Sequence, residues 1–332
     1  MKKIFSLLVS LLLCVSFLSF TGCKEPDNDT TVSLKYYGAA PELLQALKQG
    51  VATVGVLPEP VASTLEKTDS KKWYRLDLQQ LYDSEKSSYP QAVLMVKTSL
   101  LNSYNTEITQ FAEGIDDNVS WAKENVSDAI SAINDSLPEG TVASFTNNNL
   151  TASVIENCKI KWQGVNTQTK EQVKNYIDDI MSISDKSATA VTDDLFYNST
   201  ATQIFNGEKI TVAVPDGAPA LAIAKYIKNG VSFEGKPLEF NVVKADQIGT
   251  STADIKIMPV NAATKTYNKN ALDPYVMLGI VTHGNLYIMS TEQISKDDLG
   301  GKTIGLFGLG QVPDLTTQSV LKKLSYQYKV AI

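Results

Sequence analysis

The sequence repeats one local pattern five times: a short β-branched strand, a turn of glycine, proline or small residues, and an amphipathic helix. The five segments are 32–47, 53–67, 210–228, 254–267 and 303–324. Strands that alternate with helices predict parallel sheets. Ligands of such sheets bind at the carboxyl ends of the strands, where the turns converge. The five turns are therefore the candidate binding site.

The rest of the chain separates these units into two groups. Further strands are expected at 91–98 and 240–245, and two more within 275–290 around a turn at 282–285. Residues 99–186 have a mainly helical period, and the polar segment 187–209 is predicted to be a linker. The order is therefore strand–helix units, a helical block, a linker and more strand–helix units.

The N-terminus has the features of an export signal. Two lysines precede an apolar run at 4–20, which is followed by 21-TGC-23. A transmembrane anchor is the alternative, but about 17 apolar residues lie at the short limit for a membrane span. We therefore interpret residues 1–23 as a signal peptide and the polar stretch 24–31 as a tether.

The composition argues against several classes of function. The 332 residues suffice for two domains, and a formal net charge of −6 argues against a nucleic-acid partner. Arg75 is the only arginine, so the chain has little capacity to bind an anion through guanidinium groups. The three cysteines are Cys14, Cys23 and Cys158, which leave no disulfide framework or cysteine-rich metal site in a mature chain.

These segments resemble the substrate-binding proteins of ABC importers, of the taurine/nitrate/sulfonate and thiamine-precursor (type II) kind. In that family the mature chain usually begins with a unit similar to 210-ITVAVPDGAPALAIAKYI-227. It continues through segments similar to 254–263, 280–290 and 299–324, and then 32–63 and 89–96. All blocks are present here in rotated order, so the chain is similar to a circularly permuted member. A fusion of two unrelated half-domains is the alternative.

The resemblance implies an α/β fold of the type II periplasmic-binding-protein kind, with two parallel or mixed sheets and a ligand cleft between two lobes. One lobe would combine 32–92 with 294–332, and the other would span 93–293. The N-terminus resembles a bacterial lipoprotein signal, in which Cys23 would carry the lipid. This places the protein in the cell envelope, on the outer face of the cytoplasmic membrane or in the periplasm.

The function implied by the resemblance is that of a monomeric, lipid-anchored receptor that delivers a small organic solute to the permease of an ABC importer. No catalysis, cofactor or metal is expected. The alternatives are a sensory solute-binding protein and a thiamine-pyrimidine synthase on the same fold, whose cysteine-rich motif Cys158 alone does not supply. The scarcity of arginine favours a planar, largely neutral nitrogenous solute.

The turns of the 210 and 254 units supply the first candidate ligand contacts. Asp216 can cap the following helix, and Gly217 permits close approach of the backbone to a ligand. Asn261 offers hydrogen-bond donors and an acceptor. An ordinary turn for Asp216 and a helix cap for Asn261 are the alternatives.

The next two turns contain further candidates. Thr282, His283 and Asn285 surround the turn between two apolar strands, and His283 is the only histidine. A structural role is as frequent for such a histidine as a ligand contact. Gly310 and Gln311 lie in 308-GLGQVPD-314, whose spacing is not the dinucleotide fingerprint. Its backbone N–H groups instead suit an anionic or carbonyl group at a helix N-terminus.

The remaining candidates come from the other half of the chain. Tyr37 can stack on a flat ligand or pack in the core. Little positive charge is expected near Glu59, so its carboxylate favours a ligand with N–H or cationic groups. The alternative is that Glu59 is a solvated residue at the start of a helix. Tyr89 lies where the chain returns between the expected lobes, together with Gln91.

Overall fold

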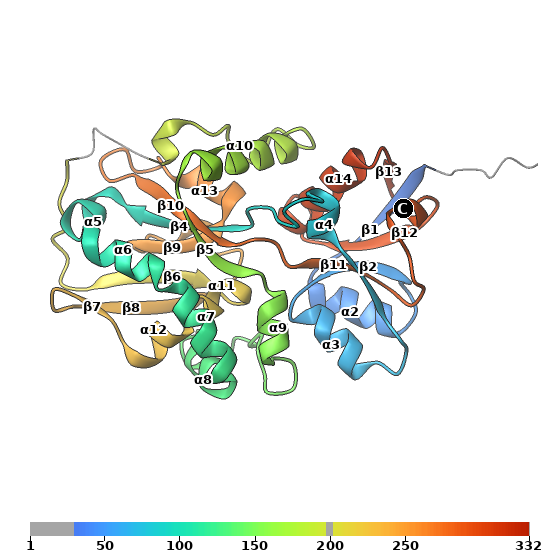
Figure 1. Ribbon diagram of the computed structural model, residues 1–332, viewed down its shortest axis with the longest axis horizontal. Coiled ribbons are helices and arrows are strands. Elements are labelled where there is room, and N and C mark those ends of the chain that lie inside the picture. Colours follow the sequence, from blue (N-terminus) through green and yellow to red (C-terminus); the bar gives the residue numbers. More distant parts are fainter. Residues whose placement is uncertain (1–29, 197–201, 332) are drawn as a thin grey trace, which may run out of the picture.

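The computed structural model describes residues 30–196 and 202–331. Cys23 and the rest of the predicted signal peptide lie outside the described residues. The described chain is a mixed α/β protein with two sheets, each flanked by helices, which lie side by side along the long axis of the molecule (Figure 1). None of its helices combines the length and the hydrophobicity that a membrane span requires.

The six-stranded sheet is built from the two ends of the described chain. Its strand order is β13-β1-β12-β2-β11-β3. The strands are β1 (Thr31–Tyr37), β2 (Val54–Pro58), β3 (Tyr74–Asp77), β11 (Leu286–Ser290), β12 (Thr303–Phe307) and β13 (Gln327–Val330). Its helices are α2 (Ala40–Lys48), α3 (Val61–Thr68), α4 (Leu78–Tyr82) and α14 (Val312–Lys323). β1 and β13 pair in parallel, so the first and last described strands are neighbours.

The seven-stranded sheet has the order β5-β10-β4-β9-β6-β8-β7. Its strands are β4 (Ala92–Lys97), β5 (Ile160–Gly164), β6 (Ile210–Pro215), β7 (Ser232–Phe233), β8 (Lys236–Val243), β9 (Ile255–Pro259) and β10 (Tyr275–Thr282). The helices around it are α5 (Thr98–Ser103), α6 (Asn105–Glu113), α7 (Ile115–Glu124), α8 (Val126–Asp135), α9 (Ala152–Asn157), α10 (Thr167–Met181), α11 (Ala218–Leu221), α12 (Ala224–Asn229) and α13 (Val260–Thr266). Short 3-10 turns, η1 to η3, occur at Asp193–Leu195, Ile248–Thr250 and Lys296–Asp298.

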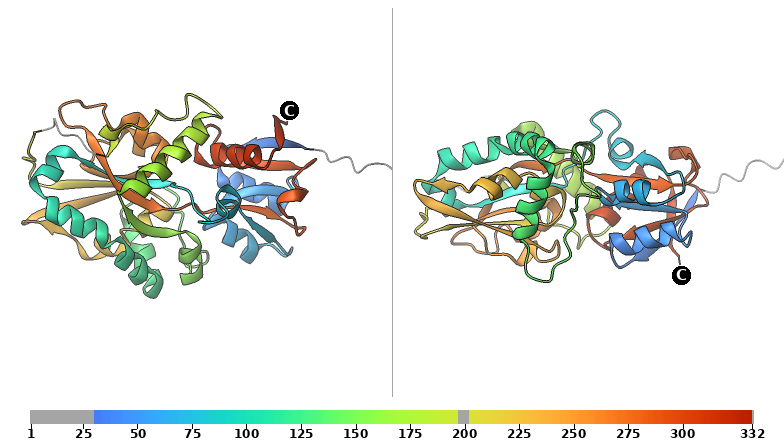
Figure 2. Two further views of the ribbon diagram at one scale, coloured as in Figure 1. Left: turned by 45° about the horizontal axis from the view of Figure 1, so that its top comes forward. Right: turned by 90° about the horizontal axis from the view of Figure 1, so that it is seen from below.

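The two sheets share one strand arrangement. The series β1-β12-β2-β11-β3 and β8-β6-β9-β4-β10 each contain three parallel strands, one antiparallel strand, and a strand antiparallel to that one. In each sheet the antiparallel strand is the first strand after the chain crosses from the other sheet. These crossings run from α4 to β4 and from β10 to β11, and both are visible between the sheets in the two views of Figure 2.

All five predicted strand–turn–helix units are present, and local sequence explains them. Pro41, Pro219 and Pro313 each occupy the first or second position of a helix, where a missing N–H costs no helical hydrogen bond. The 210 unit differs from expectation, because its helix is broken into α11 and α12 around Ala222 and Ile223. Both of these residues are buried, so tertiary packing overrides the continuous helical period.

Two boundaries differ from the sequence prediction. The block 99–186 contains a strand, β5, which pairs with the edge of β10. The expected boundary after residue 293 is wrong for β11, because this strand pairs with β2 and β3 of the six-stranded sheet. Both strands of 275–290 are apolar, and an apolar strand alone does not specify which sheet it joins. In the described parts of the predicted linker, Leu195 and Phe196 are buried against the core.

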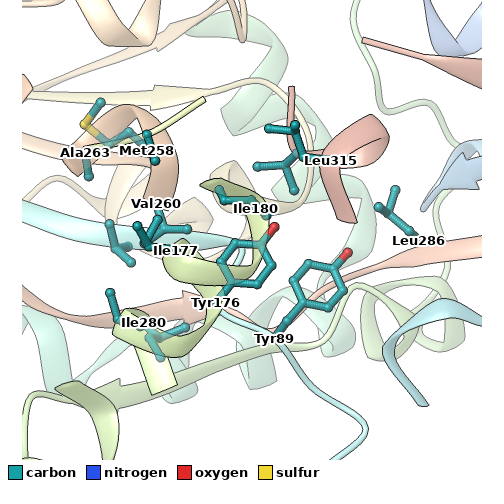
Figure 3. Packing of buried hydrophobic residues seen from close by; sticks show 14 of the residues in the cluster. Tyr89, Tyr176, Ile177, Ile180, Met258, Val260, Ala263, Ile280, Leu286 and Leu315 are labelled. Carbon is teal, nitrogen blue, oxygen red and sulfur yellow. The ribbon is translucent and has the colours of Figure 1, made fainter. Parts of the chain in front are cut away.

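One hydrophobic cluster is continuous across both sheets. It includes Leu34 and Val56 of the six-stranded sheet and Val93 and Met258 of the seven-stranded sheet. Figure 3 shows its centre, where Tyr89 lies beside Tyr176 of α10 and residues of α13 and α14 converge. The core therefore continues through the crossing between the sheets.

Candidate functional site

Both sheets present the carboxyl ends of their parallel strands to the crossing. Leu286, where the chain enters β11, pairs with Pro58 at the end of β2. Ala92, where it enters β4, pairs with Pro259 at the end of β9 and with Thr282 at the end of β10. The turns that follow these strands therefore lie at the facing edges of the two sheets, which is where open α/β sheets bind ligands.

A hydrogen-bond network joins several predicted site residues at the crossing. The Gln91 N–H donates to the Thr282 carbonyl at 2.9 Å, and the Tyr89 N–H donates to the His283 carbonyl at 3.4 Å. The Gln91 amide also donates to Asn285 Oδ1 at 2.9 Å, and the Glu59 N–H donates to the Asn285 carbonyl at 3.0 Å. The structure thus gathers residues that are up to 226 positions apart, since Glu59 and Asn285 belong to the same network.

Asn261 lies next to this network. The Val260 N–H donates to the Gln91 carbonyl at 3.0 Å, which holds the start of α13 against the crossing. The Asn261 side chain is 5 % exposed, and its amide donates to the Ser187 carbonyl at 3.2 Å. It is not a helix cap, because the N-cap of α13 is Pro259 and has no side-chain cap bond.

Several buried polar atoms at the crossing have no hydrogen-bond partner in the described chain. They are Tyr89 OH, Gln91 Oε1, Asn261 Oδ1 and Thr282 Oγ1. The Asn285 N–H lies near Tyr89 OH but outside hydrogen-bond geometry. Thr282 and Tyr89 are fully buried. An unsatisfied buried polar group costs about 1–3 kcal/mol, and such groups concentrate at functional sites. Four of them around one network mark the crossing as the candidate site.

His283 has a defined tautomer. Its Nε2 lies 3.0 Å from the Lys161 carbonyl, which only accepts, so Nε2 carries the hydrogen. Nδ1 lies 3.2 Å from Ser88 Oγ and accepts from that hydroxyl in the neutral ring. Burial lowers the pKa of His283 below its usual value, so the neutral ring is favoured. His283 therefore ties the crossing to the start of β5.

This shift predicts a pH dependence of stability. The unfolded chain binds the His283 proton at a higher pH than the folded chain, so stability should fall as the pH drops through about 6.5. Replacement by glutamine keeps a donor for the Lys161 carbonyl and removes the titration. As the pH is lowered from about 8 to about 5, the unfolding temperature should therefore decrease less in His283→Gln than in wild type. Equal slopes would contradict the assignment.

Glu59 differs from its sequence interpretation. Its side chain is 0 % exposed and forms an ion pair with Arg75, whereas little positive charge was expected nearby. The carboxylate also accepts from Ser63 Oγ at 2.9 Å and from Asn157 Nδ2 at 3.2 Å. These donors occupy the carboxylate, so Glu59 positions neighbouring residues rather than offering a free acceptor. Arg75 is the only arginine in the sequence, but its pairing with Glu59 could not be predicted from the sequence.

Tyr176 is a central residue that sequence analysis missed. Its ring stacks on Tyr89 with centroids 5.4 Å apart and an interplanar angle of 10°. Its hydroxyl lies 2.8 Å from Thr316 Oγ1 of α14, so α10 and α14 meet above Tyr89 (Figure 3). Tyr82 of α4 packs edge-on against both rings. The helical period of α10 predicted a buried face but not its partner.

The turn after β6 contains two other predicted residues, Asp216 and Gly217. The predicted helix cap by Asp216 is wrong, because the N-cap of α11 is Gly217 and no side chain caps this helix. Asp216 Oδ2 accepts from the Ser144 N–H at 2.9 Å, while its Oδ1 is buried without a partner. Gly217 has φ of 120°, a conformation that favours glycine, and an added Cβ would meet nothing within 4 Å. It therefore leaves the backbone of this turn open.

The turn before α14 is not a free anion site. The Gly310 N–H donates to Asp314 Oδ2 at 2.8 Å, and the Gln311 N–H donates to the Gly308 carbonyl at 2.8 Å. Asp314 is 1 % exposed and also accepts from Tyr36 OH. Because this carboxylate already occupies the helix N-terminus, the expected role of Gly310 in binding an anion is wrong. The Gln311 side chain is exposed.

Tyr37 packs beside the core of the α2 layer rather than against the crossing network. Its hydroxyl is buried without a partner, and Lys35 Nζ lies 5.7 Å from its ring centroid. A shallow depression on α2 is lined by Pro41, Glu42, Gln45, Ala46, Gln49 and Val51. The Tyr37 side chain contributes no hydrogen bond to the crossing network.

No cluster of three or more histidine, cysteine or acidic side chains suited to a metal ion occurs within residues 30–196 and 202–331. Cys158, at the end of α9, is fully buried, and burial raises the pKa of its thiol. Its thiolate is therefore disfavoured.

No family model matches the chain, and no curated protein matches it. Among solved structures, the oligopeptide-binding protein AppA from Bacillus subtilis, in complex with a nonapeptide, has 9 % sequence identity and a TM-score of 0.26. The match covers 79 % of this chain and 56 % of that one, so the chain spans little more than half the length of AppA.

Proposed function

We propose that the protein is the solute-binding component of an ABC importer, and that it holds a small organic solute between two lobes. The observation that carries this proposal is the convergence of strand ends from both sheets on one network with unsatisfied polar groups. The rotated order of family-like blocks supports the same class. No catalytic step is proposed. A sensory solute-binding protein would bind its solute in the same way, but its closed form would contact a receptor and not a permease.

Binding would act through a hinge. Two segments, 83–91 and 283–285, join the sheets, and a solute that contacts both lobes favours the closed arrangement. Contacts between the lobes are already present. Asn157 of α9 donates to Glu59, and Tyr287 OH donates to the Asn157 carbonyl at 3.0 Å. Tyr176 and Thr316 make a second bridge.

A thermal-shift screen of nutrients against residues 24–332 tests this function. At least one amino acid, amine, nucleobase, vitamin precursor, sulfonate or short peptide should raise the unfolding temperature and bind stoichiometrically by calorimetry. The bound solute should be recovered unchanged after incubation. Absence of any binder, or conversion of the solute to a product, would contradict the proposal.

Lipid anchoring is proposed from the signal-like N-terminus, with Cys23 as the modified residue. Cys23→Ser removes the thiol that would carry the lipid. When the full-length gene is expressed in a bacterium that processes lipoproteins, wild type should sediment with membranes and Cys23→Ser should not. Cys158→Ser is the matched control and should sediment like wild type. Membrane association of Cys23→Ser equal to that of wild type would overturn the assignment.

Circular permutation is proposed from the block order. A variant that begins at Ile210, joins residue 331 to residue 30 and ends at residue 196 restores the family-like order. β1 and β13 are parallel, so residues 331 and 30 lie at opposite ends of these neighbouring strands and the joining linker needs about a dozen residues. With such a linker the variant should fold with the same circular dichroism and a similar unfolding temperature. An unfolded variant would argue against the proposal.

A further inference from the structure

We infer that the site at the crossing takes a small solute that presents several N–H donors and carries no negative charge. This inference rests on the proposed function and specifies its solute class. It comes from the identity of the buried atoms that lack partners, rather than from any resemblance.

The unpartnered atoms are all of one kind. Within the described chain, every buried side-chain polar atom without a hydrogen-bond partner is an oxygen, and none is a nitrogen. The set consists of Tyr37 OH, Tyr89 OH, Gln91 Oε1, Asn134 Oδ1, Asp216 Oδ1, Asn261 Oδ1 and Thr282 Oγ1. Amide and carboxylate oxygens only accept, whereas hydroxyls also donate. At the crossing, Gln91 Oε1 and Asn261 Oδ1 can therefore only accept, while the Tyr89 and Thr282 hydroxyls can accept or donate.

Four of these atoms belong to the crossing. Gln91 and Thr282 share a backbone hydrogen bond of 2.9 Å, and Tyr89 is bonded to His283, the next residue after Thr282. Asn261 follows Val260, whose N–H donates to the Gln91 carbonyl. These backbone bonds place the four residues side by side at the crossing.

The direction of the Asn261 amide is fixed by its partner. Its Nδ2 donates to the Ser187 carbonyl at 3.2 Å, and a carbonyl cannot donate, so the opposite orientation would place two acceptors together. Oδ1 is therefore the atom left free, and it requires a donor from outside the protein. Amide, amine, amidine and guanidine groups supply such donors.

The charges at the crossing favour the same solutes. Arg75 is engaged by Glu59 and Glu66, so its guanidinium is not free for an anion. The two imidazole nitrogens of His283 face the Lys161 carbonyl and the Ser88 hydroxyl. The Lys161 cation that acts on His283 is exposed to solvent. An added carboxylate or sulfonate would face further acceptor oxygens with only this solvated charge nearby, so burying it there would be costly.

A panel of matched solutes tests the inference. Amides and amidines are compared with the methyl ester and carboxylate of the same scaffold, for example benzamide and benzamidine with methyl benzoate and benzoate, and likewise for acetyl and phenylalanyl scaffolds. Binding confined to donor-bearing members, by thermal shift and calorimetry, is the expected result. Equal or tighter binding of esters or carboxylates overturns the inference and leaves the proposed function intact. If neither this panel nor the nutrient screen yields a binder, the proposed function fails as well.

Thr282→Val separates a ligand contact from a structural role. The replacement removes a hydroxyl that has no protein partner, so the ligand-free variant should be at least as stable as wild type. The best donor-bearing solute of the panel should nevertheless bind roughly five- to 150-fold more weakly. Tyr89→Phe is a second variant with the same expectation. Thr317→Val is the control, because its hydroxyl already donates to the Pro313 carbonyl and it should leave affinity unchanged. Wild-type affinity in both Thr282→Val and Tyr89→Phe would overturn the inference.

Discussion

Replacing Arg75 by methionine should lower the free energy of unfolding by about 3–5 kcal/mol, because it leaves the buried Glu59 carboxylate without its cation. The Glu59 side chain is 0 % exposed and that of Arg75 is 20 % exposed, so solvent screens this pair weakly. The Glu59 carboxylate keeps its bonds from Ser63 and Asn157, which places the expected loss at the lower end of that range.

Two further variants test the cause of this loss. Glu66→Gln weakens the outer contact of the same guanidinium, and it should cost less than about 1 kcal/mol because Glu66 is partly solvated. Arg75→Met combined with Glu59→Gln removes both charges and should recover most of the stability. Urea unfolding with an unchanged denaturant slope is the measurement. A double variant as unstable as Arg75→Met would show that the loss comes from packing against Tyr287 instead.

Local sequence predicts the parts of this fold that depend on neighbouring residues. The five strand–turn–helix units follow from hydrophobic period, proline at the helix start and small residues in the turns. Parallel pairing also predicts that strand ends meet at one edge, and the structure joins Glu59, Gln91 and Asn285 in one hydrogen-bond network there. Spacing along the chain sufficed for this, because the rule is geometric.

Contacts between distant segments could not be predicted in the same way. β11 has the apolar composition of a buried strand in either sheet, and only the crossing of the chain decides which sheet it joins. Glu59 looked like a free carboxylate because its partner lies on another strand, 16 residues later. Gly310 looked like an anion-binding donor because nothing in the turn reveals that Asp314 folds back onto it. Each error concerns a partner that tertiary packing supplies.

Gly284→Ala should cost about 2–5 kcal/mol, the sum of about 1–2 for a left-handed backbone and about 1–3 for overpacking. Gly284 has φ of +86°, and an added Cβ would lie 2.6 Å from Gln79 Cγ and 2.6 Å from the Tyr89 ring. Neither neighbour has room to move. Tyr89 is stacked on Tyr176, and the Gln79 side chain is held by bonds to Asp77 and Leu286.

Gly310→Ala is the matched control for this clash. Its φ of +72° imposes a similar backbone cost, but an added Cβ there meets nothing within 4 Å, so the loss should be about 1–2 kcal/mol. The difference between the two variants in chemical unfolding isolates the close approach at the crossing. Because the Gly284 clash displaces Tyr89, that variant should also bind solute more weakly, whereas Gly310→Ala should not. Equal losses of stability in the two variants would mean that the crossing relaxes easily, and the tight packing on which the site is built would not hold.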